Sequence, residues 1–222
     1  MAPFRISILP VTAFQQNCTV LYDPASREAL VFDPGGEPGR IHNFLTRQGL
    51  AVQRILLTHG HLDHAGGAAA LKGLLDAPRI EAGQPPVEIW GPQEADRFLL
   101  EQIDRQQQAL GLSGLCNVLP DRWLADGDTV EWRDFRFEVL HCPGHTPGSV
   151  VYVERTARFA VVGDVLFAGS VGRSDFAYGN GPALIDNIKT RLLPLGDDIS
   201  FIPGHGPGST FGAERQGNPF LA

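Results

Sequence analysis

The sequence predicts a mixed α/β fold in which two sheets pack together and helices cover their outer faces. Short strand patterns alternate along the whole chain with segments that have apolar residues at helical spacing. Hairpin patterns are more frequent than a series of β-α-β units would contain, which favours mixed sheets over one parallel sheet. The chain has 222 residues, 43% of them hydrophobic, and can therefore bury a sizeable core.

The first half of the chain begins with three strand patterns, of which the last two end in Asp-Pro turns. A helix and a buried strand follow, and then a helix of small residues for which Asp63 is the expected N-terminal cap. A surface loop, a short strand and one long helix complete this half. In order, these elements cover residues 4–10, 18–24, 29–36, 38–49, 52–58, 65–75, 81–86, 87–92 and 92–110.

The second half predicts two hairpins, a helix and a last strand, over residues 129–145, 149–167, 183–195 and 199–206. No internal repeat longer than the hairpin pattern is visible, and the Gly- and Pro-rich places are short and lie between elements. We therefore expect one domain over residues 1–222.

Composition argues against several classes of protein. The net charge is -7 without a run of Lys and Arg, so we expect no nucleic-acid binding. No segment approaches the ~20 apolar residues of a membrane span, and the first 14 residues do not have the pattern of an export signal. The odd number of widely spaced cysteines, Cys18, Cys116 and Cys142, suits a reducing compartment. We therefore expect a cytoplasmic protein.

The stretch LLTHGHLDHAGG, residues 56–67, places three of the seven histidines within six positions, directly after an apolar strand pattern. An exposed polar turn would explain neither this density nor this position. Three later strand ends carry CPGHTPGS, VVGDVLF and IPGHGPGS, and each of these alone would be weak evidence. Together the four loops offer His59, His61, Asp63, His64, His145, Asp164 and His205.

Imidazole and carboxylate groups bind zinc, iron and manganese, and a carboxylate can bridge two ions. Seven ligands are too many for one tetrahedral ion, but they suit two ions that share an aspartate and hold a solvent molecule between them. The remaining histidines are His42, expected on a helix surface, and His141, expected to pack near the site with Cys142. Asn17 is expected to be a turn residue.

These residues resemble the metallo-β-lactamase superfamily and, within it, the short bacterial glyoxalase II-like (hydroxyacylglutathione hydrolase-like) proteins. The resemblance runs nearly from end to end, through PVTAFQQNC, DPGG, LLTHGHLDHAGG, DRWLADGD, LHCPGHTPGS, GDVLF, GRSDF and FIPGHGPGSTFGAERQGNPFL. It implies a four-layer αββα sandwich, the metallo-β-lactamase fold, with two mixed sheets flanked by helices and the metals at one edge.

The resemblance also implies an assignment of ligands to two divalent metal ions, with zinc expected and iron or manganese as alternatives. The ligands of the first ion would be His59, His61 and His145, and those of the second ion would be Asp63, His64 and His205. Asp164 would bridge the two ions. We expect Asp63 and Asp164 to be catalytic together with a metal-bridging hydroxide.

A hydroxide held by two ions would attack a carbonyl carbon, and one ion would stabilise the oxyanion. A thioester suits such a site because its thiol, with a pKa near ~8.5, leaves as thiolate without a strong general acid. We therefore expect hydrolysis of a small-molecule thioester, such as S-lactoylglutathione or another glutathione derivative. Arg173, Tyr178 and Lys189 are candidates for binding it, although Arg173 has an ion pair with Asp175 as its alternative.

The chain differs from the glyoxalase II pattern in two places. We expect no C-terminal helical domain of the kind that helps glyoxalase II bind glutathione, so other residues of the chain would have to bind the thiol half. The segment at residues 81–86, EAGQPP, lengthens a connection that is usually short.

Four alternatives remain open, besides a hydrolase for another ester. An iron-dependent persulfide dioxygenase acting on glutathione persulfide would share the histidine run and a stretch similar to GRSDF, with iron on His59, His145 and Asp164. A secreted β-lactamase would need an export signal, and a nuclease a basic groove and an additional domain. A binding module without turnover would be expected to lose some of the seven ligands.

Overall fold

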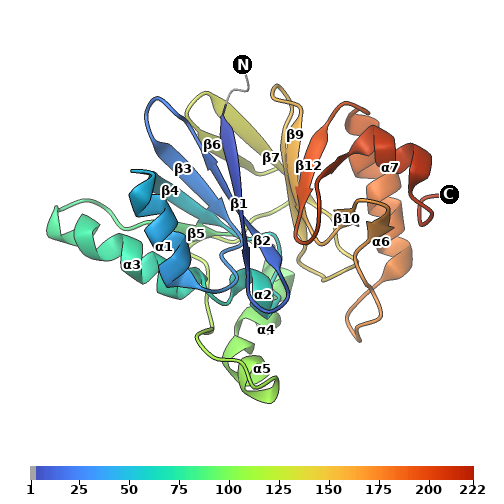
Figure 1. Ribbon diagram of the computed structural model, residues 1–222. Helices are drawn as coiled ribbons and strands as arrows, with labels where there is room; N and C mark the ends of the chain where they lie inside the picture. The colour runs from blue at the N-terminus through green and yellow to red at the C-terminus, as the bar shows by residue number, and fades with distance from the viewer. Residues whose placement is uncertain (1–3) are drawn as a thin grey trace. The chain divides into compact units, whose positions relative to one another are not determined.

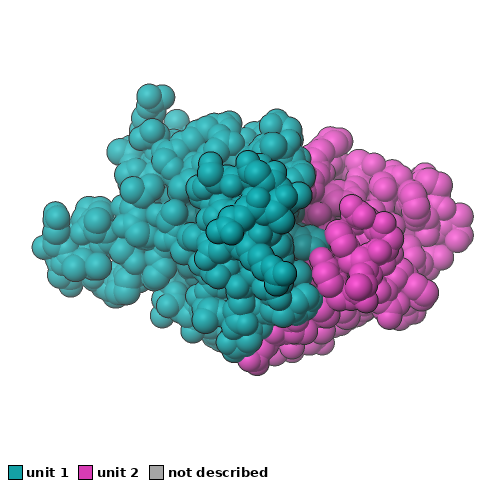
Figure 2. All heavy atoms as spheres, turned by 90° about the horizontal axis from the view of Figure 1, so that it is seen from below, with its two compact units in different colours: residues 1–91, 97–123 teal, residues 92–96, 124–222 magenta. Residues whose placement is uncertain are grey.

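The structure is a computed structural model that describes residues 4–222. Its chain divides into two compact units, coloured separately in Figure 2: unit 1 comprises residues 1–91 and 97–123, and unit 2 residues 92–96 and 124–222. Each unit is built on one large sheet with helices of its own. Residues 1–3, part of the stretch from which the absence of an export signal was expected, lie outside the described residues.

Unit 1 contains a five-stranded mixed sheet, shown in blue and cyan in Figure 1, with the strand order β1-β2-β3-β4-β5. β1, β2 and β3 pair antiparallel, whereas β3, β4 and β5 pair parallel. The bounds are β1 Arg5–Val11, β2 Gln16–Tyr22, β3 Glu28–Phe32, β4 Ala51–Leu56 and β5 Glu88–Trp90. Because β4 lies inside the sheet, its buried end presents the following histidine loop at a fixed position.

Helices α1 and α3 of unit 1 pack against each other and share one hydrophobic core with the sheet (Figure 1). In α1, Ile41 and Leu45 are one helical turn apart, and both are buried. The helices of this unit are α1 Pro38–Arg47, α2 Leu62–Ala65, α3 Ala68–Glu81, α4 Arg97–Leu100 and α5 Ile103–Ala109.

Unit 2 contains a six-stranded mixed sheet with the order β13-β12-β9-β8-β7-β6, in which only the β12/β9 pair is parallel among the described strands. Its bounds are β6 Thr129–Trp132, β7 Phe135–His141, β8 Val150–Glu154, β9 Phe159–Gly163, β12 Ser200–Pro203 and β13 Ser209–Thr210. A small hairpin follows β9, formed by β10 Leu166–Phe167 and β11 Ser170–Val171.

The helices of unit 2 lie at the orange and red end of the chain in Figure 1 and pack on a second hydrophobic core. α6 Gly181–Asn187 continues into a π-helical turn, Ile188–Leu192, and a 3-10 turn, Leu193–Leu195, and α7 spans Phe211–Gly217. A further 3-10 turn, η1, covers Glu94–Asp96. Among the helices of residues 4–222, none has the length and apolar character needed to cross a membrane.

Three local predictions are wrong. Asp63 does not cap the helix of small residues, because it lies inside the separate short helix α2, whose N-cap is His61. The long helix expected over residues 92–110 is interrupted after α4. There, Asp104 and Asn117 exchange side chain-to-backbone hydrogen bonds, so the N–H group of Asp104 is satisfied from outside the helix. Asn17 is the second residue of β2, where it is buried and paired with Pro10.

Candidate metal centre

The Asp-Pro-Gly-Gly turn after β3 holds the first histidine loop by direct backbone contact. A Cβ atom on Gly35 would lie 1.4 Å from the carbonyl oxygen of Asp63, so only glycine fits against the backbone of α2. Asp33 at the start of this turn has a left-handed backbone with φ 48, an uncommon conformation for a residue with a side chain. The sequence predicted a turn here, and the structure shows that this turn supports the loop at residues 58–67.

The buried carboxylate of Asp33 organises this loop through hydrogen bonds. Its Oδ1 accepts from the backbone N–H of Thr58 at 2.7 Å, and its Oδ2 accepts from the Thr58 hydroxyl at 2.6 Å and from Nδ1 of His64 at 2.9 Å. Since the hydroxyl proton of Thr58 is directed to Asp33, its Oγ1 can accept a hydrogen bond from Nδ1 of His59, 3.1 Å away. One carboxylate thereby fixes the proton of two imidazoles on Nδ1.

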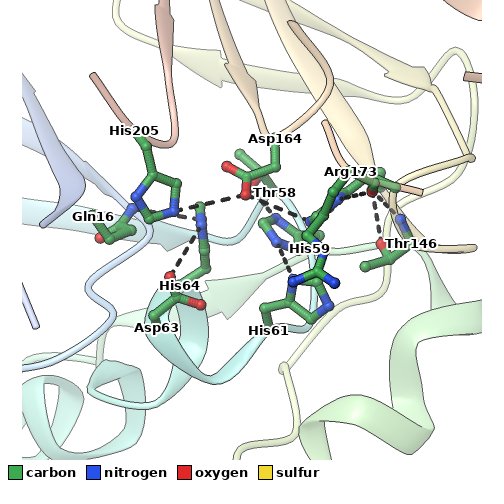
Figure 3. A network of polar contacts seen from close by, with 12 residues as sticks. Gln16, Thr58, His59, His61, Asp63, His64, Thr146, Asp164, Arg173 and His205 are labelled. Atoms are coloured by element: carbon green, nitrogen blue, oxygen red, sulfur yellow. Dashed lines mark hydrogen bonds and ion pairs between the residues drawn. The ribbon is translucent and has the colours of Figure 1, made fainter. Parts of the chain in front are cut away.

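This protonation pattern leaves the Nε2 lone pairs of His59 and His64 available to a metal ion. Figure 3 shows His59 and His61 facing each other, with His59 Nε2 3.1 Å from His61 Nδ1. Two nitrogen ligands of one tetrahedral zinc ion are expected about 3.4 Å apart, from Zn–N bonds of about 2.0–2.1 Å. On the other side of His64, Oδ2 of Asp63 lies 3.9 Å from Nε2. The donor set of unit 1 therefore fits metal binding.

Unit 2 contributes a second group, centred on one oxygen atom. Oδ2 of Asp164, directly after β9, lies 3.5 Å from Nε2 of His145. The same oxygen lies 3.7 Å from Nε2 of His205, and Figure 3 shows Asp164 and His205 side by side. Nδ1 of His145 donates to the backbone oxygen of Arg173 at 2.7 Å, which again directs Nε2 of that ring to the Asp164 carboxylate. A single carboxylate oxygen between two imidazole nitrogens is a suitable shared ligand.

The His145 loop is braced by Asp96, which is fully buried. Its Oδ1 accepts from the N–H of Gly148 at 2.6 Å, and its Oδ2 accepts from the hydroxyl of Thr146 at 2.7 Å. His141 donates from Nε2 to the carbonyl oxygen of Pro147 at 2.8 Å, so the residue expected to pack near the site does contact this loop. These contacts fix the residues on the C-terminal side of His145.

The other side of the His145 loop approaches helix α6. Gly144 has φ 144, and an added Cβ would lie 2.5 Å from the Cβ of Leu184, so a larger residue would displace the helix. The side chain of Asn187 donates to the carbonyl oxygen of Pro143 at 2.9 Å. The loop is therefore held between α6 and Asp96.

The His205 loop is tied to the C-terminal helix by Glu214, which is 4% exposed. Its Oε1 accepts from the hydroxyl of Ser209 at 2.5 Å, and its Oε2 accepts from the N–H of Gly169 and the amide of Asn218, both at 2.8 Å. Gly169 lies in the β10–β11 hairpin, whose Phe167 ring is 6.4 Å from the ring of His205. The C-terminal motif GAERQGNPF thus supports one side of the His205 loop.

The three substrate-binding candidates lie in two environments. The exposed Arg173 forms two hydrogen bonds with Asp175, at 2.8 and 2.9 Å, and its guanidinium lies 4.4 Å from the centre of the Phe176 ring. The Tyr178 ring stacks on Phe176 at 5.2 Å, and burial raises the pKa of its hydroxyl. Lys189 donates to the backbone oxygen of Ala222. The ion pair that was the alternative for Arg173 is present, and substrate binding by these three residues stays a prediction.

Cys142 is a neutral thiol at physiological pH, because burial raises its pKa to about 12. Burial likewise raises the pKa of Cys18 well above its ordinary range. Neither residue offers the thiolate that a nucleophile or a metal ligand requires. His42 is partly exposed on α1.

All seven predicted ligands lie in loops after strands or in the short helix that follows one. The structure gathers His59, His61, Asp63 and His64 in unit 1, and His145, Asp164 and His205 in unit 2. Asp33, Thr58, Asp96 and Glu214 were not among the predicted site residues. Asp33, Thr58 and Glu214 lie in the stretches DPGG, LLTHGHLDHAGG and FIPGHGPGSTFGAERQGNPFL that carry the family resemblance, whereas Asp96 lies outside all of them.

Comparisons with known proteins cover nearly the whole chain. Residues 11–205 match the Metallo-beta-lactamase superfamily. The chain is 46% identical over 218 residues to the hydroxyacylglutathione hydrolase GloC of Haemophilus influenzae, covering 98% of each chain. It is 33% identical over 219 residues to the probable metallo-hydrolase YqgX of Bacillus subtilis, covering 96% of this chain and 95% of that one.

Two solved structures are also similar over nearly their full length. The BLEG-1 B3 metallo-beta-lactamase is 32% identical with a TM-score of 0.85, covering 98% of this chain and 99% of that one. TTHA1623, crystallised in a di-iron-bound form, is 34% identical with a TM-score of 0.82, covering 97% of this chain and 100% of that one. These similarities confirm the predicted fold class.

Proposed function

Because the chain belongs to the metallo-β-lactamase superfamily and is a metal-dependent hydrolase, we propose that it cleaves thioesters of 2-hydroxy acids, such as S-lactoylglutathione. The observation that carries this proposal is the 46% identity to a hydroxyacylglutathione hydrolase over 98% of both chains. The same relative supports the choice of a small, glutathione-derived substrate.

We assign two divalent ions to the seven ligands. His59, His61 and His145 would hold the first ion, and Asp63, His64 and His205 the second. Asp164 would be shared by both, which is supported by its Oδ2 atom lying between two imidazole nitrogens in unit 2. Zinc suits a set of ligands that is rich in imidazole nitrogens. Iron is the alternative, because the similar protein TTHA1623 was crystallised in a di-iron-bound form.

Two bound ions would supply a hydroxide nucleophile at neutral pH and an electrophilic site for the developing oxyanion. Asp33 and Thr58 would hold the imidazoles of His64 and His59 in the protonation state that binds metal. Asp63 and Asp164 would place negative charge on the ions and orient the attacking oxygen. No strong general acid is needed, because a thiol with a pKa near ~8.5 leaves as thiolate.

Arg173 and Tyr178 are proposed to contact the thiol half of the substrate. Both flank Phe176, whose ring lies edge-on to His145 at 5.8 Å between ring centres. A guanidinium can pair with a carboxylate of glutathione in place of Asp175. Lys189, which contacts Ala222, would need to release that contact to take part. We further propose that the chain acts in the cytoplasm as one domain.

Elemental analysis of the purified protein, together with hydrolysis of S-lactoylglutathione, tests this proposal. We expect two ions per chain and thioester hydrolysis that chelation removes and added metal restores. Oxygen uptake with glutathione persulfide by a protein holding one iron would instead identify a persulfide dioxygenase. A cephalosporin is assayed as a further substrate because of the similarity to the BLEG-1 metallo-beta-lactamase. Cleavage of the cephalosporin in preference to any thioester would contradict the proposal.

A further inference from the structure

Two arginines and a tryptophan of unit 1, none of them a candidate metal ligand, gather at the β5 edge of the sheet. β4 and β5 lie side by side in this sheet (Figure 1), and Arg54 of β4 pairs with Glu88 of β5. Trp90, two residues after Glu88, points to the same face of the sheet. Arg122 extends this face beyond β5, because it pairs with Trp90 in an isolated parallel bridge. We call Arg54, Trp90 and Arg122 the edge cluster.

Both guanidinium groups of the edge cluster lie against the same indole ring. The Cζ atom lies 3.7 Å from the centre of the Trp90 ring in Arg54 and 4.6 Å from it in Arg122. The indole N–H group donates to Oε2 of Glu88 at 2.8 Å, which fixes the orientation of the ring. Aromatic faces attract cations, so one ring brings two positive charges close together.

The guanidinium of Arg54 has a hydrogen-bond donor that the chain does not use. Its Nε atom is buried and has no hydrogen-bond partner within residues 4–222. The contact with Trp90 stabilises the positive charge, but a buried N–H group without an oxygen acceptor still bears the cost of its desolvation. Arg54 is half-buried and Arg122 is exposed, so an acceptor from solution can reach the edge cluster.

The charges of the edge cluster favour an anion. Burial lowers the pKa of Arg54, the carboxylate of Glu88 opposes this shift, and the charge of Arg122 adds to it. A guanidinium stays protonated at neutral pH, so two positive charges lie near one exposed carboxylate that already accepts from the indole. A second negative charge at this place would reduce the repulsion between the two guanidinium groups.

We propose that the edge cluster binds a phosphate group, with Arg54 as the main donor and Arg122 as the second. A phosphate presents several acceptor oxygens in a tetrahedral arrangement, so it can accept from both guanidinium groups at once. A carboxylate offers only two oxygens and lower charge. The site does not depend on the proposed function, because none of the seven candidate ligands belongs to the edge cluster.

The test is a titration of the metal-loaded protein with inorganic phosphate at constant ionic strength, followed by the indole ¹H–¹⁵N signal of Trp90. Trp90→Phe assigns this signal among the three tryptophans of the chain. A signal local to the edge cluster is required, because metal ions also bind phosphate oxygens. We expect the signal to shift and saturate with a Kd of about 1 mM or lower.

Two further compounds define the ligand. Glycerol 3-phosphate is titrated in the same way, and the tighter of the two phosphate compounds identifies the source as free phosphate or a phosphomonoester. Acetate should bind at least about tenfold more weakly than phosphate, because it is a monoanion with two oxygens. Acetate binding as tight as that of phosphate would overturn the assignment to a phosphate group.

Arg54→Gln removes the main donor and should raise the Kd for phosphate at least about tenfold. Arg54→Lys keeps the charge but not the planar fork, and its Kd should lie between those of wild type and Arg54→Gln. Arg47→Gln is the matched control, because Arg47 is an exposed arginine of unit 1 outside the edge cluster, and it should leave the Kd unchanged. Phosphate should also raise the Tm of wild type and Arg47→Gln by more than that of Arg54→Gln.

Equal Kd values for phosphate in wild type and Arg54→Gln would overturn the proposal, and so would a Trp90 signal of wild type that phosphate does not shift. If Arg54→Gln does not fold, Arg122→Gln gives the same comparison at an exposed side chain. It should raise the Kd at least about threefold, and an unchanged Kd in this variant would likewise contradict the assignment.

Discussion

The carboxylate of Asp33 accepts a hydrogen bond from Nδ1 of His64 at 2.9 Å. It also reaches His59 through the hydroxyl of Thr58. One buried acid therefore determines which nitrogen of each imidazole carries the proton, and in both rings the lone pair suited to a metal ion is on Nε2.

We expect Asp33→Asn to lower metal affinity by about 10–100-fold, because the amide can present an N–H group to Nδ1 of His64 and favour the wrong tautomer. Thr58→Val should lower metal affinity by a smaller factor, because it removes the hydroxyl that contacts Nδ1 of His59 but leaves the hydrogen bond between Asp33 and His64. Thr58→Ser, which keeps the hydroxyl, is the matched control. Competition with a chelator measures the affinities, and ¹⁵N shifts of the imidazoles report the tautomers. Unchanged tautomers and affinity in Asp33→Asn would contradict this role of Asp33.

Glu214→Ala should lower the free energy of unfolding by about 1–3 kcal/mol, because it removes the acceptor of the buried Asn218 amide and of the part-buried hydrogen bonds from Ser209 and Gly169. The exposed Glu81→Ala at the end of α3 is the control and should change it by less than about 0.5 kcal/mol. Urea denaturation measures both variants. Equal stability of the two variants would show that the C-terminal helix does not brace the His205 loop energetically.

Stability should fall at alkaline pH through the buried thiol of Cys142. The pKa of this thiol is raised to about 12 in the folded protein, against about 8.5 in an unfolded chain. The contribution of the Cys142 thiol to the free energy of unfolding is fully present below pH ~8.5 and is lost as the pH rises towards 12. In this range only the unfolded chain releases the thiol proton. The loss approaches about 1.4 kcal/mol per pH unit.

We expect Cys142→Ala to be less stable than wild type at pH 7, because the substitution leaves a small cavity, and to lose less stability between pH 9 and 11. Denaturant unfolding of both proteins across this range tests the prediction. If the free energy of unfolding of the two proteins fell in parallel with pH, the thiol would have the same pKa in the folded and the unfolded chain, and the prediction would be wrong.

The sequence was sufficient to predict that the seven candidate ligand residues lie at strand ends, because each follows an apolar strand pattern that is visible without the fold. His59, His145, Asp164 and His205 do follow β4, β7, β9 and β12 in the structure. Strand periodicity and the residue types that bind metal are both local signals.

The supporting residues could not be predicted in this way, because their partners are distant in sequence. Asp96 holds Thr146 and Gly148 across about fifty positions, and Glu214 holds Gly169 across forty-five. The same cause explains the wrong prediction for residues 92–110. Helical periodicity continues through that segment, but Asn117 interrupts it with hydrogen bonds that only the folded chain brings into place.

Asp164→Asn, analysed for metal content and for hydrolysis of S-lactoylglutathione in one preparation, tests most directly the proposal that two ions share this carboxylate. We expect wild type to hold two ions per chain and the variant to lose most of both together with its activity, whereas His205→Ala should deplete mainly one ion. Unchanged metal content and rate in Asp164→Asn, or full wild-type activity with a single ion, would contradict the account.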